Sequence, residues 1–138
     1  PANPPHSLRP PDLVEPVVAD AEIRKIIKDL KPKSAPGLDR LTKSHLLSLP
    51  PTWFSTITNI CNACLRVGYF PDQWKVGKLI TIPKPDVDPR DITAHRPLTV
   101  TSNLGKVLEH VILNRLTPRV IDLLPEWQFG FRPQMSTL

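Results

Sequence analysis

The chain has 138 residues, of which 40% are hydrophobic and 22% charged. That is enough for one domain with its own core. It excludes a disordered chain, and no window approaches the roughly 18 consecutive apolar residues of a membrane-spanning helix. Lysine and arginine exceed the acids by five, with a pI near 9.5, which favours polyanionic partners such as nucleic acid or nucleotides without requiring them. The N-terminus lacks the apolar core of a secretion signal, so we expect an intracellular protein.

Proline is over-represented, with 18 residues against an average usage of about 5%. Residues 1–19 are especially rich in it and are expected to form a proline-rich linker or lead-in. The prolines further along the chain separate the periodic segments, as boundaries do.

Helical periodicity begins after this lead-in. Apolar residues at helical spacing between positions 23 and 30 predict a helix that begins near Asp20 and ends before Pro32. The carboxylate of Asp20 is expected to cap the first turn, and Glu22 suits its positive end.

Two further helices are expected before the middle of the chain. A short one runs from about Thr42 to Pro50, and a longer one covers about 52–66, with Gly68 as its C-terminal stop. The apolar stripe expected on the longer helix comprises Trp53, Ile57, Ile60, Cys61, Cys64 and Leu65.

Cys61 and Cys64 are the two cysteines of the sequence. A CxxC pair can be half of a zinc site, but a closed site needs four ligands, and no second CxxC or HxxxH occurs. Because residues three apart share a helix face, packing in the core is favoured over metal or redox chemistry.

Two β-type runs, 79–82 and 98–100, flank a polar, proline-rich segment. Lys84 lies at the end of the first run, between two prolines, and Arg96 opens the second. A two-stranded hairpin is marginal alone, so we expect helices to cover it. The resulting fold class is α+β, mostly helical, with four or five helices around a small antiparallel element.

The last predicted helix follows, capped by Ser102 or Asn103 and ending near 116. Arg115 is expected to face away from the core, and Pro118 and Pro125 to bracket a short apolar turn. The expected apolar stripe comprises Leu104, Val107, Leu108, Val111, Ile112 and Leu116.

No catalytic motif is recognisable in these segments. Asp86, Asp88 and Asp91 cluster in one loop but lack the glycine and glutamate of a calcium loop, so solvated turn aspartates are favoured. The four histidines are scattered, and no metal site is expected.

Four segments, in order and with compatible spacing, resemble the fingers part of the reverse transcriptases of non-long-terminal-repeat (jockey-like, LINE-type) retrotransposons. Ser34 stands where Lys or Arg is frequent in the family, and His95 replaces an aromatic residue. The resemblance implies a partial reverse transcriptase domain over 20–138, with a fold like the fingers of a right-hand polymerase. The segments are KPKSAPGLDRLT (31–42), GYFPDQWKVGKLITIPKP (68–85), HRPLTVTSNLGKVLEHVILNRL (95–116) and QFGFRPQMST (128–137).

The resemblance implies roles for two cations. Carried over by position, Lys84 and Arg96 contact the triphosphate of the incoming nucleotide, because phosphoryl transfer depends on positioning and on neutralising phosphate charge. The alternative is that both are solvated charges that protect a sheet edge.

Other residues are assigned by the same resemblance. Pro36, Gly37 and Asp39 correspond to a structural turn near the template or primer, although a well-formed turn alone explains them equally well. Lys75 is a candidate phosphate contact, as are Lys78 and Lys106, although surface lysines are often merely solvated. Template contacts are implied for the segment that contains Gln128, Gly130, Phe131 and Arg132, where Phe129 and Phe131 could instead be core.

The family's catalytic aspartates bind Mg²⁺ on the palm, beyond Leu138, so we expect this chain alone to be inactive. The expected partners are an RNA template, a DNA primer, a dNTP and the remainder of a polyprotein in the cytoplasm and nucleus, with no membrane. Two alternatives remain: a non-catalytic nucleic-acid-binding module, or a protein-interaction domain that exposes apolar residues such as Phe129, Phe131 and Met135.

Overall fold

The computed structural model describes residues 18–88, 90–130 and 132. Most of the expected lead-in over 1–19 lies outside the described residues. Val18 already belongs to the folded body, because it is buried and its backbone N–H and carbonyl both bond to the side-chain amide of Asn62.

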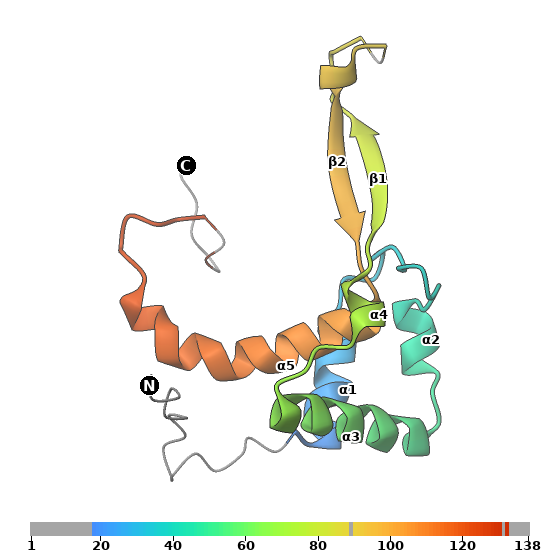
Figure 1. Cartoon of the computed structure of the whole chain (residues 1–138), viewed down its shortest axis with the longest axis vertical. Coiled ribbons are helices and arrows are strands. Elements are labelled where there is room, and N and C mark those ends of the chain that lie inside the picture. The colour runs from blue at the N-terminus through green and yellow to red at the C-terminus, as the bar shows by residue number, and fades with distance from the viewer. Residues whose placement is uncertain (1–17, 89, 131, 133–138) are drawn as a thin grey trace, which may run out of the picture.

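Within the described residues, five α-helices form the body of the molecule, and Figure 1 shows their arrangement. They are α1 (Asp20–Asp29), α2 (Lys43–Leu47), α3 (Pro51–Val67), α4 (Asp72–Lys75) and α5 (Asn103–Val120). Helix α1 is central, because it packs against α2, α3 and α5. None of the described helices is long and apolar enough to cross a bilayer.

The other elements of the described chain are one antiparallel hairpin and two short 3₁₀ helices, so the α+β class is confirmed. Strands β1 (Lys78–Pro83) and β2 (His95–Val100) pair with Lys78 opposite Val100 and Pro83 opposite His95. The 3₁₀ helix η1 (Ile92–Ala94) precedes β2, and η2 (Ile121–Leu123) follows α5.

The expectation that helices cover the hairpin is wrong. Figure 1 shows the two strands projecting from the helical body. Apolar side chains on them, Leu79 and Leu98 among them, remain exposed. The hairpin is therefore joined to the body at its foot, where β2 leads into α5.

The core lies where α1, α3 and α5 meet. Ile23 and Ile27 of α1 are fully buried, and they form one cluster with residues of the other helices. Burial of such side chains contributes about 1.5–3 kcal/mol each. The other members of this cluster are Val18, Ile26, Leu30, Leu46, Phe54, Ile57, Cys61, Cys64, Val107, Leu108 and Val111.

Both cysteines are buried and unpaired, which confirms their packing role. Burial raises the pKa of the Cys61 thiol to about 12, and the nearby Cys64 adds to the shift. The Cys61 thiol is therefore neutral and poorly nucleophilic at physiological pH.

Two details of the helix boundaries differ from expectation. The cap of α1 is Ala19, and Asp20 is the first helical residue. The Asp20 carboxylate accepts a hydrogen bond from the Ser55 hydroxyl at 2.7 Å instead of capping the helix. Helix α5 continues through Pro118 to Val120. Gly68 ends α3 as predicted, with a left-handed φ of 68°.

The predicted apolar stripes were too wide. Trp53 and Ile60 of α3 are exposed, and so are Ile112 and Leu116 of α5. Each helix contacts its neighbours over a narrower arc than its apolar residues span. The wider stripe leaves apolar surface uncovered within the described part of the chain.

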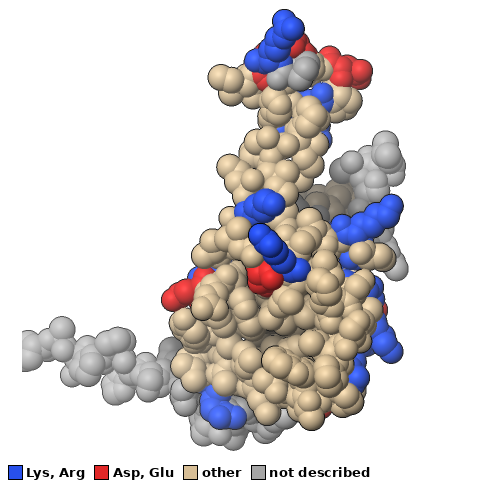
Figure 2. Space-filling model, turned by 90° about the vertical axis from the view of Figure 1, so that its right-hand side faces the viewer, with Lys and Arg blue, Asp and Glu red and all other residues tan. Residues whose placement is uncertain are grey.

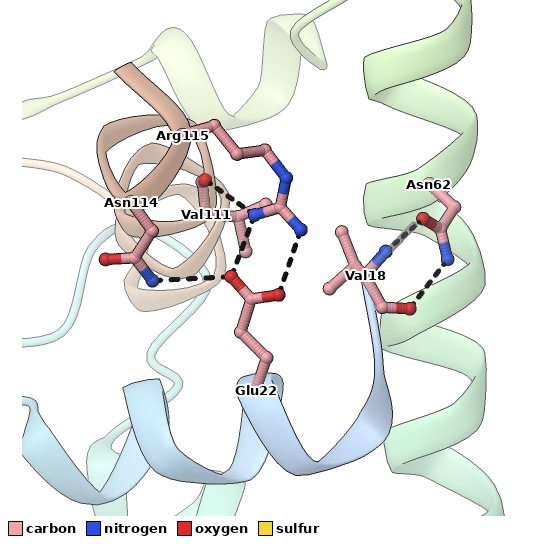
Figure 3. A network of polar contacts seen from close by, with 6 residues as sticks. All are labelled: Val18, Glu22, Asn62, Val111, Asn114 and Arg115. Atoms are coloured by element: carbon pink, nitrogen blue, oxygen red, sulfur yellow. Dashed lines mark hydrogen bonds and ion pairs between the residues drawn. The ribbon is translucent and has the colours of Figure 1, made fainter. Parts of the chain in front are cut away.

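A bidentate ion pair joins α1 to α5 (Figure 3). The Arg115 guanidinium donates to both carboxylate oxygens of Glu22, at 2.8 and 3.0 Å, and also to the Val111 carbonyl. Asn114 adds a weaker bond at 3.3 Å. Arg115 is thus half-buried and turned toward α1, contrary to the expectation that it faces away from the core.

This ion pair predicts an acid-sensitive contribution to stability. Bonding to Arg115 lowers the pKa of Glu22 below its ordinary value. Because the pKa of Glu22 is lower in the folded than in the unfolded state, the ion pair stabilises the fold at pH values above the unfolded pKa of about 4.3. This stabilisation is lost as the pH falls through the pKa of the folded state. Glu22→Gln should therefore lower the free energy of unfolding by about 1–2 kcal/mol near neutral pH, after a discount for partial exposure.

Urea unfolding of wild type and Glu22→Gln at about pH 7 and about pH 3 checks this expectation. The difference between the two proteins should shrink at the lower pH. The matched control is Glu109→Gln, since Glu109 is exposed on α5 and its loss should change little. An equal deficit at both pH values would contradict the linkage.

Candidate functional site

The two cations singled out in the sequence lie on one face of the hairpin, at its far end. Arg96 is opposite Ile82 in the register, and the Lys84 backbone N–H extends the ladder by donating to the Ala94 carbonyl at 2.6 Å. Since side chains alternate along a strand, Lys84 and Arg96 are diagonal neighbours on the same face. Diagonal neighbours of this kind are about 7–8 Å apart.

The side chain of Lys84 is oriented by the hairpin itself. Its Nζ donates to the backbone carbonyl of Thr93 at 2.8 Å, within η1, and the side chain is half-buried. An ammonium has three donors, so two remain for another acceptor. Arg96 is exposed, and no carboxylate in the described chain pairs with either cation.

The three aspartates of the hairpin loop are exposed, as favoured from the sequence, and two of them also bond to the backbone of the loop. The Asp88 carboxylate accepts a hydrogen bond from the backbone N–H of Arg90. The Asp91 carboxylate accepts one from the backbone N–H of Thr93, and Asp91 in this way caps the N-terminus of η1. The bonds from Thr93 also lower the pKa of Asp91. Across the residues that the structure describes, no group of three His, Cys, Asp or Glu side chains could hold a metal ion.

The turn at Pro36, Gly37 and Asp39 is packed against the N-terminus of α5. A Cβ on Gly37 would lie 2.7 Å from the backbone nitrogen of Ser102, so only glycine permits this approach. The Asp39 carboxylate accepts a short hydrogen bond from the Ser102 hydroxyl, whose oxygen in turn caps α5 by accepting from Leu104 N–H at 3.1 Å. The turn therefore holds the point where β2 passes into α5.

A second set of polar bonds reinforces this junction. Asn103 is fully buried, and its amide donates to the Leu41 carbonyl at 2.7 Å. Lys106 donates to the Ser34 hydroxyl at 2.9 Å. A buried amide without such partners costs free energy. These bonds therefore favour a single position of the segment 34–41 on α5.

Lys75, a candidate phosphate contact, is exposed at the end of α4. Its ammonium pairs with Asp72 at 2.7 Å and lies 5.6 Å from the centre of the Tyr69 ring. This bonding raises the pKa of Lys75 and lowers that of Asp72. A phosphate that binds Lys75 must therefore compete with the Asp72 carboxylate. A phosphate that binds Arg96 meets no such competitor, since no carboxylate of the described chain pairs with Arg96.

The C-terminal segment lies apart from the hairpin tip in Figure 1. Gln128 is half-buried and its N–H donates to the Pro125 carbonyl, which Arg132 also contacts at 3.2 Å through its guanidinium. Gly130 has open space around its α-carbon. Phe131 lies outside the described residues, and the structure does not bring this segment together with Lys84 and Arg96.

Sequence reasoning missed several parts of this site. The Thr93 carbonyl, which orients Lys84, carries no side-chain signal at all. Ser102 and Asn103 were identified as helix caps, but their bonds to Asp39 and Leu41 join residues more than sixty positions apart. Such long-range partners are invisible to local patterns.

Comparison with known proteins gives several relatives, although no family model matches the chain. The chain is 40% identical over 118 residues to the RNA-directed DNA polymerase from mobile element jockey of Drosophila funebris, and 39% identical to that of Drosophila melanogaster. It is 38% identical over 119 residues to the probable RNA-directed DNA polymerase from transposon BS of Drosophila melanogaster. These alignments cover 84–85% of the chain, which spans 13% of the length of each relative.

The close approach at Gly37 generates a stability prediction. Gly37→Ala places a methyl group against the backbone of Thr101 and Ser102, which cannot rotate away as a side chain can. We expect the free energy of unfolding to fall by about 1–3 kcal/mol, measured by urea denaturation. The matched control is Gly130→Ala, because a Cβ there meets nothing within 4 Å. Equal stability of the two variants would show that the turn is not pressed against α5.

Proposed function

We propose that this chain, a segment that belongs to the family of RNA-directed DNA polymerases of jockey-like and other non-long-terminal-repeat retrotransposons, serves as the fingers region of such an enzyme. In this role the segment works within a longer polypeptide and contacts the incoming dNTP and the RNA template. The hairpin formed by β1 and β2 is the element that reaches the nucleotide.

The observation that carries this proposal is the pair of cations at the far end of the hairpin. Lys84 and Arg96 share one face and have no carboxylate partner in the described chain. Lysine can bind a phosphate as a compact point charge, and arginine as a planar donor that forms paired bonds, so the two together suit a triphosphate. The end of the hairpin that carries them projects away from the helical body (Figure 1).

The geometry explains how the two side chains could act on a triphosphate. The bond from Lys84 to the Thr93 carbonyl holds the ammonium in place while two of its donors stay available for phosphate oxygens. Arg96 can then contact a second phosphate group along the same face. Positioning and charge neutralisation of this kind are the main contributions that a protein makes to phosphoryl transfer.

The described residues do not fit the Mg²⁺ ions that polymerases use for this chemistry. Asp88 and Asp91 bond to backbone N–H groups of their own loop, and no other acidic cluster occurs in the part of the chain that the structure describes. In the proposed enzyme, the metal ligands come from the rest of the polypeptide. The DNA primer is likewise a partner of the assembled enzyme.

Template contact is proposed for the C-terminal segment. Gln128 and Arg132 are both bonded to the Pro125 carbonyl, and Gly130 leaves space for a close approach of another group. The separation of this segment from the hairpin tip suits contact with a different part of the substrate (Figure 1).

Substitution at the hairpin tip tests the nucleotide role. In the longer polymerase that carries this segment, Lys84→Ala and Arg96→Ala should each raise the KM for dNTP by about 10–100-fold, as expected for loss of a charge-assisted hydrogen bond. Primer extension on an RNA template at varied dNTP concentration measures this. Arg119→Ala is the matched control, since Arg119 is an exposed cation in the last turn of α5, outside the hairpin.

The control should keep the wild-type KM, and circular dichroism should show that all three variants are folded. Extension by Lys84→Ala and Arg96→Ala at wild-type dNTP affinity would mean that the tip cations do not contact the triphosphate. The pair would then be solvated charges on a projecting sheet edge.

A further inference from the structure

Lys84 is held by two successive residues of the 3₁₀ helix η1. Its backbone N–H donates to the Ala94 carbonyl at 2.6 Å, and its side-chain ammonium donates to the Thr93 carbonyl at 2.8 Å. The two bonds fix the lysine at both ends, at the backbone and at Nζ. The direction in which Lys84 presents its free donors therefore depends on where η1 holds these two carbonyls.

A helix as short as η1 has little stability of its own. It spans three residues, Ile92–Ala94, and fixing a first turn costs more entropy than one internal hydrogen bond returns. Apolar burial contributes little, because Ile92 is 91% exposed and the buried side chain of η1 is that of Ala94. The position of η1 therefore depends on polar bonds to neighbouring residues.

Asp91 supplies such bonds. Its carboxylate accepts from the Thr93 N–H at 2.9 Å, and its backbone carbonyl accepts from the Ala94 N–H at 3.0 Å. Its own N–H donates to the Asp88 carbonyl at 3.0 Å, which ties the residue to the rest of the loop. Thr93 and Ala94, whose carbonyls hold Lys84, are thus the two residues whose N–H groups bond to Asp91.

Acidic side chains lie beside basic ones at the tip of the hairpin, as Figure 2 shows. A carboxylate that paired with Lys84 or Arg96 would compete with a phosphate for the cation. The Asp91 carboxylate is instead engaged by the Thr93 N–H, and it forms no ion pair within the described residues. The same bonding keeps the pKa of Asp91 below its ordinary value, so the carboxylate stays ionised and able to accept at neutral pH.

We propose that Asp91 is a positioning residue for the nucleotide site: by capping η1 it fixes the two carbonyls that hold Lys84, and so raises the affinity for dNTP without touching the nucleotide. The inference rests on the proposed function, because the orientation of Lys84 matters only if this lysine contacts the triphosphate. A side chain that is already oriented loses less entropy on binding. Loss of the cap lowers the fraction of molecules in which Lys84 is held ready, and the apparent affinity falls by the same factor.

Substitution of Asp91 in the longer polymerase tests this role, with primer extension on an RNA template at varied dNTP concentration. Asp91→Ala should raise the KM for dNTP by about 3–10-fold, less than Lys84→Ala, because it removes one cap bond and leaves the lysine in place. The kcat should stay within about twofold of the wild type, since bound nucleotide then orders the lysine. Asp91→Asn should keep the wild-type KM, because asparagine caps a helix about as well as aspartate does.

Asp88→Ala is the matched control. Asp88 is an exposed aspartate of the same loop, and its carboxylate accepts from the Arg90 N–H at 3.0 Å and not from η1. Its substitution removes the same charge and the same kind of bond, so the KM should stay as in the wild type. In the Lys84→Ala background, Asp91→Ala should add no further rise in KM, because a residue that acts through Lys84 then has nothing left to position.

Amide hydrogen exchange in the 138-residue chain gives a second readout that needs no nucleotide. Asp91→Ala should speed the exchange of the Lys84 and Ala94 N–H groups, measured by NMR, because η1 is no longer capped. The N–H groups of Ile80 and Leu98, which lie opposite each other in the middle of the hairpin, should exchange as in the wild type. This local pattern separates a loosened tip from an unfolded hairpin.

A wild-type KM for Asp91→Ala, an equal rise in Asp88→Ala, or unchanged exchange at Lys84 and Ala94 would overturn the proposal. It would also be overturned if Asp91→Asn were as impaired as Asp91→Ala, since the charge and not the cap would then matter. Failure here is distinguishable from failure of the nucleotide role. If Lys84→Ala raises the KM and Asp91→Ala does not, the positioning role alone is wrong. If Lys84→Ala itself keeps the wild-type KM, the nucleotide role is the one that fails.

Discussion

The contact between the turn at Gly37 and the backbone of Thr101 and Ser102 is the constraint on which the position of the hairpin, and with it the proposed nucleotide site, depends. It joins the α1–α2 loop to the point where β2 passes into α5. The Asp39 carboxylate bonds to Ser102 at the same place, and the Ser102 oxygen caps α5. One junction therefore sets the position of the hairpin and of the loop relative to the helical body.

The hairpin depends on this junction because little else supports it. Its two strands are bonded to each other over six residue pairs, but their side chains are mostly exposed on both faces. A hairpin with so little buried surface has a small stabilisation of its own. Fixing its foot lets a short, exposed element carry the tip cations at a defined distance from the body. The bond from Lys84 to the Thr93 carbonyl then orders the tip locally.

The helices of the body are held together mainly by an apolar core, unlike the exposed hairpin. This core joins α1, α3 and α5, while the Glu22–Arg115 pair and the bonds between Val18 and Asn62 lie at the margin of that core (Figure 3). Partly buried, bidentate pairs specify how two helices are oriented, whereas apolar contacts alone permit several orientations of similar energy. Such pairs help to keep α5, and with it the hairpin, in one position.

The sequence by itself determined the α+β class, the three long helices, the hairpin and the buried cysteines, because these features follow from the spacing of apolar residues, glycine and proline. It also identified Lys84 and Arg96, whose places beside prolines at the strand ends are local. Tertiary structure alone decided that the hairpin projects, that Arg115 turns toward Glu22 and that Ser102 bonds to Asp39. The last two are contacts between residues 93 and 63 positions apart in the sequence. Periodicity reports which face of an element is apolar, but it does not report which distant element meets that face or how much of it stays uncovered.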